Sequence, residues 1–585
     1  MTVKERFALL KEYAGSRCPV FSGEPGCTLV FSVSDGTARA TVRHVSAPTF
    51  DEAWRLGLIR IQNRMERDKL TGRHLRVDWV ESSASVTWDE FQKRLAAVKR
   101  TYFRFGFAFD AKLTHLLTEM ECHANAVFYG GADVFVGRFN PGNFARYAAA
   151  RFAATVVPPN SPHTPVWLVS TGGAYCGPDG TLVPLPGPLP HVADSLSSGL
   201  YTGHRKIPRL TPEFLRQVVG MGSQWLCRQI LPDGKFVYGY FPCFDREIAS
   251  YNSLRHASSV YSLLDVVNFT GDSSLLEPAM RSLKFLAASQ IREYEPEPGR
   301  RMAFLVDATA GEIKLGANGA ALLAYAKHRE LTGSQEFCEL MELLAEGIAF
   351  LQNAESGVFT HVLDSETLAV KNEFRIIYYD GEAVFGLLRL YAQDNNPRWL
   401  SIARKAFDYF LGSRKHAQAH DHWLSYAANE MYAFIPDERY FSFGINNCLQ
   451  YLDFILQRET TYPTLLELMM AAQKMLTKAQ RMRHDHLVDL MDMDKFRRAL
   501  HYRAHYLLNG FFWPELAMFY KNPDRITGAF FIRHHAFRTR IDDTQHYLSG
   551  LAAYGEMLDA GDPLWAAPED ARSMGTRFRK NTDTA

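Results

Sequence analysis

From residue 211 onward, apolar positions recur with the spacing of amphipathic helices. Most of six blocks open on polar or glycine residues and continue as helices rich in small residues, leucine and tyrosine. The blocks are 251–266, 315–327, 380–390, 420–433, 463–477 and 542–558. Three of them are followed by a turn and a more amphipathic helix, at 275–286, 337–351 and 399–411. This alternation predicts paired inner and outer helices that bury their apolar faces by stacking on neighbours.

The N-terminal third has a mixed pattern. Residues 28–33 and 38–42 are rich in β-forming residues around a Ser-Asp-Gly turn, which predicts a hairpin. Helices are expected at 49–67, 87–99 and 113–125, and strands at 75–80, 127–129 and 134–136. Proline and glycine dominate 156–189, which predicts an irregular crossing. Glu119 and Glu121 are expected on solvated helix faces.

These patterns divide the chain into two domains, as its length of 585 residues also favours. We expect a small α+β domain at 1–190, a linker at 191–210, a helical domain at 211–560 and a tail at 561–585. Because six helical hairpins can close into a barrel, the predicted fold class is an α+β N-terminal domain followed by a mainly α (α/α)6 toroid.

Several short motifs strengthen the helical prediction. They are the turns Thr270-Gly271-Asp272 and Thr332-Gly333-Ser334, Asn252-x-x-Arg255-His256, Tyr379-Asp380-Gly381-Glu382-Ala383, and Asp421-His422-Trp423-Leu424. In these features residues 211–560 resemble the (α/α)6 toroid class, which includes six-hairpin glycosidases, polysaccharide lyases, sugar epimerases and the helical domain of uronyl C5-epimerases. The resemblance covers roughly three fifths of the chain, implies a fold and assigns no single family.

Charge and cysteine content narrow the function classes. The 65 Lys and Arg residues balance 64 Asp and Glu residues, which argues against a global attraction to nucleic acid or anionic membranes. The chain has no signal-peptide pattern and no apolar run long enough to span a bilayer, so we expect a cytoplasmic protein without an integral membrane segment. Its 8 cysteines never form a Cys-x-x-Cys pair, so we expect neither a metal nor a cofactor.

Candidate catalytic residues lie where the predicted inner helices begin. Helix N-termini carry partial positive charge and free N–H groups, so acids are favoured there. The candidates are Asp380, Glu382, Asp421, His422, Asp542 and Asp543. Asp380 and Glu382 are two positions apart, so they diverge on a helix and one of them is expected to face a shared cleft. The alternative role for each acid is a helix cap or a first-turn residue.

Candidate substrate-binding residues come from the same block starts and the segments that precede them. They are Asn252, Arg255, His256, Arg375, Tyr378, Tyr379, Trp423, Arg540 and His546. Arginines suit the carboxylate or phosphate of an acidic sugar, and the alternative is pairing with neighbouring acids. Aromatic side chains suit sugar faces, and the alternative is core packing. Asp542, Asp543 and His546 have no recognised metal-ligand spacing.

The predicted function is an enzyme that acts on an oligo- or polysaccharide, neutral or acidic, by carboxylate acid/base catalysis. Hydrolysis is the leading reaction, and the separation of the two carboxylates would set its stereochemistry. Epimerisation or elimination at a uronic acid is the first alternative. A non-catalytic module that binds a glycan or a protein in a polysaccharide biosynthesis complex is the second.

Overall fold

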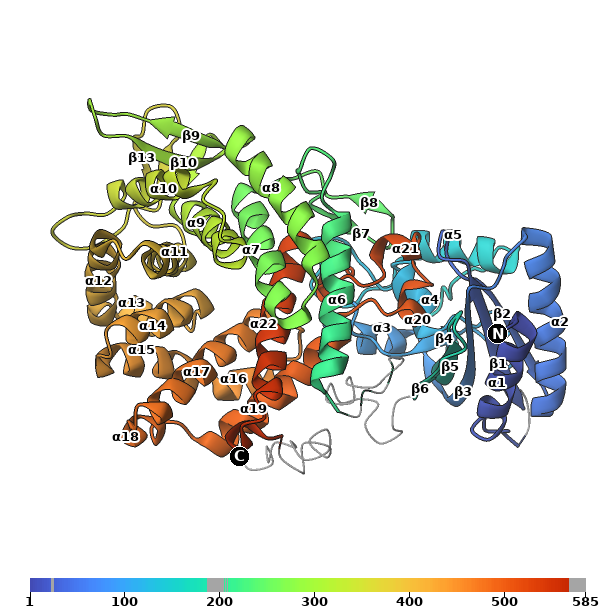
Figure 1. Ribbon diagram of the computed structural model, residues 1–585. Coiled ribbons are helices and arrows are strands. Elements are labelled where there is room, and N and C mark those ends of the chain that lie inside the picture. Colours follow the sequence, from blue (N-terminus) through green and yellow to red (C-terminus); the bar gives the residue numbers. More distant parts are fainter. Residues whose placement is uncertain (23–25, 187–204, 206, 208, 568–585) are drawn as a thin grey trace.

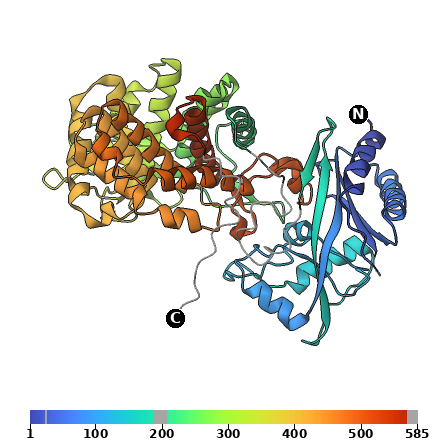
Figure 2. The same ribbon diagram turned by 90° about the horizontal axis from the view of Figure 1, so that it is seen from below.

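The computed structural model describes residues 1–585 apart from 23–25, 187–204, 206, 208 and 568–585. Most of the expected linker and of the expected C-terminal tail therefore lies outside the described residues. A β-sheet flanked by helices forms the N-terminal part, and a ring of helices forms the C-terminal part beside it (Figures 1 and 2). No helix in the described part of the chain combines the length and apolar character needed to cross a bilayer.

The N-terminal sheet is antiparallel and has six strands in the order β2-β1-β3-β5-β4, with β6 paired to β5. The strands are β1 (Cys27–Ser34), β2 (Thr41–Ala47), β3 (His74–Thr87), β4 (Gly106–Ala108), β5 (Pro165–Cys176) and β6 (Leu182–Leu185). The flanking helices are α1 (Val3–Gly15), α2 (Phe50–Asp68), α3 (Trp88–Ala96), α4 (Glu119–Ala124) and α5 (Pro141–Phe152). The predicted hairpin, α2, and α3 with its Thr87 cap are confirmed.

Other N-terminal predictions are wrong for local reasons. The helix expected at 113–125 begins only at Glu119, because Leu113 has a φ of 56° and Thr118 caps the helix. Residues 127–129 and 134–136 form no named strand, and Val136 makes an isolated bridge. The segment expected to be irregular holds β5, whose glycines make room for β3: a Cβ at Gly173 would overlap the Asp78 carboxylate.

Six inner helices form the ring, and each packs on the next until the last closes on the first. They are α7 (Ser253–Thr270), α9 (Leu315–Thr332), α11 (Tyr378–Asp394), α14 (His422–Phe434), α17 (Thr464–Arg481) and α22 (Ile541–Asp559). All six correspond to the predicted blocks. The outer helices are α6 (Pro212–Arg228), α8 (Leu276–Ser289), α10 (Cys338–Phe350), α12 (Pro397–Gly412), α15 (Glu438–Leu449) and α19 (Met493–Leu507). The chain therefore contains an (α/α)6 toroid, of which the sequence predicts α8, α10 and α12 among the outer helices.

Small strands and short helices complete the helical part. One five-stranded sheet contains β9 (Ile291–Tyr294), β10 (Met302–Asp307), β11 (Glu312–Lys314), β12 (Val362–Asp364) and β13 (Val370–Asn372). A second, three-stranded sheet contains β7 (Gly239–Phe241), β8 (Arg246–Glu247) and β14 (Thr539–Arg540). The short helices are α13 (Arg414–Ala417), α16 (Leu452–Gln457), α18 (Asp485–Val488), α20 (Pro514–Ala517) and α21 (Pro523–Ile526). Strands β11 and β14 lead directly into inner helices α9 and α22.

The segment between α19 and α22 joins the ring to the N-terminal sheet (Figure 2). Arg76 on β3 forms a buried ion pair with Asp78 at 2.7 Å and donates to the Glu515 carbonyl at 2.8 Å. Arg39 donates to the carbonyl of Phe519 at 3.0 Å. Because these guanidinium groups satisfy backbone carbonyls across the junction, the sheet and the ring share one buried interface.

Glu119 and Glu121 are buried rather than solvated, which corrects the sequence-based prediction. Glu119 pairs with Arg533 from the helical part at 3.1 Å, and Glu121 pairs with Arg151 at 2.8 Å. Both faces of α4 are covered, and each carboxylate has a guanidinium partner that compensates its burial.

The inner helices approach so closely that only glycine fits at several contacts. A Cβ at Gly319 on α9 would lie 2.5 Å from the backbone of Glu382 on α11. Because the neighbouring atoms are main chain, a side-chain rotation cannot relieve the overlap. Every α9 residue from Leu315 to His328 is buried, which explains why this block lacks a polar face.

We predict that Gly319→Ala lowers the free energy of unfolding by about 1–3 kcal/mol, because the added methyl group forces α9 and α11 apart. Gly220→Ala in outer helix α6 is the matched control, since a Cβ there meets nothing within 4 Å. The control should be neutral or stabilise by about 0.5–1 kcal/mol. Denaturant unfolding measures both, and equal effects of the two substitutions would contradict the close approach.

Candidate active site

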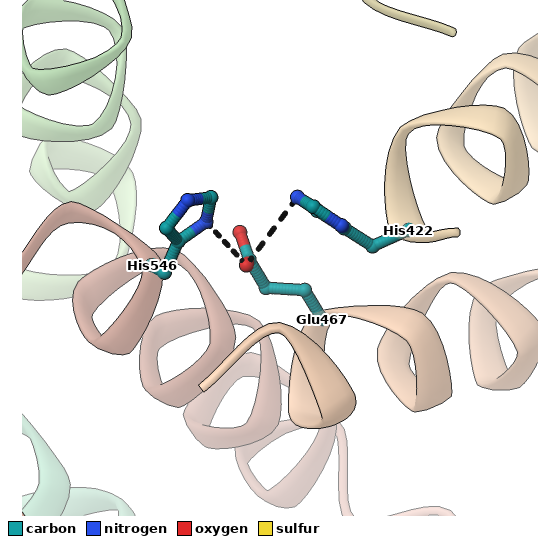
Figure 3. A group of neighbouring side chains, drawn as sticks. All are labelled: His422, Glu467 and His546. Atoms are coloured by element: carbon teal, nitrogen blue, oxygen red, sulfur yellow. Dashed lines mark hydrogen bonds and ion pairs between the residues drawn. The ribbon is translucent and has the colours of Figure 1, made fainter. Parts of the chain in front are cut away.

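The N-terminal ends of the inner helices meet at one end of the ring. Arg255 on α7 lies 3.5 Å (Nε to Oδ2) from Asp542 on α22. His546 Nδ1, also on α22, lies 2.7 Å from Glu467 Oε2 on α17, and His422 Nε2 on α14 lies 3.8 Å from the same oxygen. Four inner helices thus present side chains of their first two turns to one another, as Figure 3 shows for three of them.

The remaining inner helices α9 and α11 join the same end. The Tyr378 ring at the start of α11 lies 5.9 Å (centroid to centroid) from the His422 ring. Gly316 at the start of α9 lies against the Glu382 carboxylate and the Tyr379 ring, where a Cβ would overlap both. All six inner helices therefore begin at this end, and their partial positive charges point towards it.

Glu382 is a buried carboxyl group with one unpartnered oxygen. Its exposed fraction is 1%, and Oε2 has no hydrogen-bond partner. Burial raises the pKa of Glu382 well above its ordinary value, and the Arg255 guanidinium offsets only part of this effect. The shift favours the protonated form of Glu382, which can donate a proton.

Asp542 and Asp543 are held by arginines. Arg540 binds Asp543 through two hydrogen bonds of 3.0 and 2.8 Å and lies 3.2 Å from Asp542. Burial is the largest single effect and raises the pKa of Asp543, but the hydrogen bonds and charge of Arg540, together with the charge of Arg538, leave the pKa below its ordinary value. Asp542 contacts two guanidinium groups through Oδ2, and its Oδ1 is unpartnered. Asp542 is thus a carboxylate with one oxygen free to accept a hydrogen bond.

Asp380 diverges from Glu382, as their spacing predicts. Its two carboxylate oxygens accept from His361 Nε2 at 3.2 Å and from His416 Nε2 at 3.0 Å. Burial works to raise the pKa of Asp380, but these hydrogen bonds outweigh it and leave the pKa below its ordinary value. The backbone N–H of Arg375 donates to His361 Nδ1, which leaves Nε2–H as the donor to Asp380. Asp380 therefore ties the start of α11 to neighbouring segments.

Two further candidates cap helices. Asp421 accepts from the Leu424 N–H at 2.8 Å at the start of α14, and Asn252 accepts from the Arg255 N–H at 3.3 Å at the start of α7. Both match the capping alternative. The second carboxylate oxygen of Asp421 lies 3.3 Å from His422 Nδ1 but has no hydrogen-bond partner in the described part of the chain.

Two expected binding residues are engaged elsewhere. His256 lies in the core between hydroxyl groups of Tyr251 (2.6 Å) and Ser282 (2.7 Å), and burial lowers its pKa to about 3. Arg375 makes two hydrogen bonds to Glu312, at 2.7 and 3.0 Å. His256 therefore lies in the core, and Glu312 holds Arg375 beside Tyr379 in the first turn of α11.

Two expected aromatic residues pack in the core. Trp423 is 2% exposed and packs against Phe385 and Tyr426, which matches the core alternative. Tyr379 is largely buried, beside His361. Neither aromatic ring presents a free face for a sugar.

Glu467 is the site residue that the sequence analysis missed. Glu467 is the only acid in α17 and lies in its first turn, among buried apolar residues. A single acid in that apolar stretch was the available signal in the sequence. Burial raises the pKa of Glu467 to about 8, partly offset by His422. His422, Glu467 and His546 each offer one ligand atom, all within 4.8 Å of one another, so this group could hold a metal ion.

Neither a family model nor the sequence of a curated protein matches the chain. Among solved structures, the chain is similar to the GH76A α-1,6-mannanase from Salegentibacter sp. HEL1_6 (13% identity, 59% of this chain and 99% of the other, TM-score 0.41). It is also similar to a D-mannose isomerase (10%, 60% and 99%, TM-score 0.45) and to cellobiose 2-epimerase from Bacillus thermoamylovorans B4167 (11%, 59% and 99%, TM-score 0.45). Those activities belong to those proteins, and the toroid assignment rests on the closed ring of inner helices.

We predict that Asp380→Asn destabilises the protein by about 2–3 kcal/mol, because an amide replaces a buried carboxylate that accepts from two imidazoles. Glu438→Gln is the matched control: Glu438 pairs with His486 at 3.0 Å, but both side chains are exposed. The control should change stability by less than about 1 kcal/mol. Thermal and denaturant unfolding measure both, and a neutral Asp380→Asn would contradict the structural role.

We predict that Glu382 makes stability fall as pH rises. Its folded-state pKa lies above the unfolded value. At a pH between these two pKa values, unfolding releases a proton. The free energy of unfolding therefore falls with increasing pH in that range. Glu382→Gln removes this dependence, with a slope difference of up to about 1.4 kcal/mol per pH unit. Unfolding of both proteins between about pH 5 and 8 measures it. Parallel curves would mean that Glu382 titrates as an ordinary carboxylate.

Proposed function

We propose that this chain is a carbohydrate-active enzyme whose reaction is acid/base catalysis by Glu382 and Asp542. One observation carries the proposal. Glu382 on α11, whose pKa is raised by burial, and Asp542 on α22, which two arginines contact, lie at the same end of the ring, and each has an unpartnered oxygen. In the order of packing around the ring, these two helices stand opposite each other.

Glycoside cleavage requires one carboxyl group that donates a proton and a second that acts as base or nucleophile. Glu382, whose raised pKa favours the protonated form, would donate its proton to the glycosidic oxygen as the bond breaks. Asp542, which lies beside the guanidinium groups of Arg255 and Arg540, would act from the opposite side as base or nucleophile. Arg255 contacts Asp542 and lies within electrostatic range of Glu382. Because it is closer to Asp542, it would favour the ionised form of Asp542 more than that of Glu382.

A sugar substrate is supported by the aromatic and polar groups at the same end of the ring. Tyr378 lies close to Tyr462, which is 37% exposed, and beside His422. Tyrosine rings pack on the C–H faces of sugars while their hydroxyl groups bond to water or ligand. The side chains of Arg255 and Arg540 are 28% and 24% exposed and would bind hydroxyl or carboxylate oxygens of the substrate.

The arginines also favour a second candidate, epimerisation or elimination at a uronic acid, in which they would neutralise the substrate carboxylate. A binding-only module is less well supported. It requires acids that serve as caps or buried structural groups, and Asp421 and Asp380 fit that description. Glu382 and Asp542 do not, because neither side chain caps its helix and each keeps an unpartnered oxygen.

The test is turnover on a panel of neutral and uronic-acid oligosaccharides. New reducing ends report hydrolysis, ultraviolet absorbance of an unsaturated product reports elimination, and solvent deuterium in recovered sugar reports epimerisation. We predict turnover by the wild type, and losses of about 100- to 10,000-fold in kcat for Glu382→Gln and Asp542→Asn.

Glu438→Gln, on the exposed surface, is the control and should keep wild-type turnover. Thermal unfolding must show that each variant is folded. A folded wild type that binds an oligosaccharide without converting it would contradict the catalytic proposal and favour the binding module. Full activity of both carboxyl variants would remove Glu382 and Asp542 from the mechanism.

A further inference from the structure

We propose that His422, Glu467 and His546 form a binding site for a divalent transition-metal ion of the Zn²⁺ class. The ligand atoms are His422 Nε2, Glu467 Oε2 and His546 Nδ1, and the three side chains converge from three inner helices (Figure 3). The site goes beyond the proposed function, which uses none of these side chains.

The donor set and its spacing suit zinc. Zinc takes imidazole nitrogen and carboxylate oxygen at about 2.0–2.2 Å in a tetrahedron, which places neighbouring ligand atoms about 3.3 Å apart. The separations from Glu467 Oε2 are 2.7 Å to His546 and 3.8 Å to His422, on either side of that value. Small side-chain rotations would equalise them. Three protein ligands leave one tetrahedral position for water or a substrate oxygen.

An unpartnered nitrogen gives independent support for a cation at this position. His422 is 3% exposed, and its buried Nε2 has no hydrogen-bond partner although it faces the Glu467 carboxylate. Buried polar atoms are rarely left unpaired, because the desolvation penalty is then uncompensated. A metal ion between Nε2 and Oε2 would accept the imidazole lone pair and satisfy the carboxylate together.

The surroundings also resemble the support that metal ligands usually receive. His422 Nδ1 lies 3.3 Å from Asp421, whose other oxygen is fixed by the Leu424 N–H. The Asp421 oxygen nearer to Nδ1 has no hydrogen-bond partner in the described structure. A small rotation of either side chain would let Asp421 accept the Nδ1 proton, which would leave the Nε2 lone pair for the metal. The Tyr426 side chain lies beside Glu467, the third ligand.

The local charge leaves room for a cation. Among the described residues, the ion pairs of Glu467 are with the two histidines alone, and no lysine or arginine lies within ion-pair distance. The acids Asp542 and Asp543 on the same arc of the ring each have arginine partners. Glu467 therefore differs from these acids in having no arginine partner within the part of the chain that the structure describes. A bound metal ion could supply the positive charge that compensates its burial.

The experiment is a Zn²⁺ titration of the full chain after chelator treatment, followed by calorimetry and by thermal unfolding. We expect one equivalent to bind and to raise Tm, because the metal binds the native state. His422→Ala and His546→Ala should each weaken binding by more than about 100-fold, since each removes one of three ligands. Asp421→Asn keeps the helix cap, since Asn caps as well as Asp, and should weaken binding about 10- to 100-fold.

His486→Ala is the matched control, because His486 also lies 3.0 Å from a glutamate but on the exposed surface. It should bind Zn²⁺ like the wild type. If the ligand variants do not fold, X-ray absorption of the zinc-loaded wild type decides: two imidazoles with an oxygen ligand support the site, whereas sulfur or oxygen ligands alone overturn it. No Zn²⁺ binding by the wild type, or unchanged binding in both folded histidine variants, also overturns it.

Discussion

The close packing of six inner helices around a closed ring is the constraint on which the rest of the structure depends. The contact between α9 and α11 is tight enough that Gly319 meets the main chain of Glu382. Closure leaves no exposed face on these helices, so polar side chains in their first turns are buried together at one end. Each buried acid there must be paired, capped or neutral, because an isolated buried charge is too costly to keep.

The acids at this end meet that requirement in different ways. Asp380 accepts from two histidines, Asp421 caps a helix, and Asp543 is bound by Arg540. Burial raises the pKa values of Glu382 and Glu467, which favours the protonated form of both carboxyl groups in the absence of a bound cation. The same helical starting positions therefore yield structural groups, a candidate proton donor and a candidate metal ligand, according to what each side chain contacts.

The toroid could be predicted from the sequence, because the period of its apolar residues and the Thr-Gly turns are local signals. The N-terminal sheet was harder: β5 contains the glycines that make room for Asp78, and in the sequence these glycines indicate a loop. The candidate site was partly predictable, since Glu382, His422, Asp542 and His546 all lie near helix starts. Sequence alone could not separate them from other helix-start residues whose partners come from distant segments. Glu467 was missed because its role depends on two histidines 45 and 79 positions away in the chain.

The central claim is that Glu382 and Asp542 act on one sugar held between them at the N-terminal end of the ring. A crystal structure of the Glu382→Gln variant with a bound oligosaccharide tests this most directly. We predict that a glycosidic oxygen lies within hydrogen-bond distance of the amide that replaces the Glu382 carboxyl group. The Asp542 carboxylate should lie beside the same sugar ring. A sugar bound away from both positions, or a helix end closed by side chains with no sugar in it, would contradict the claim.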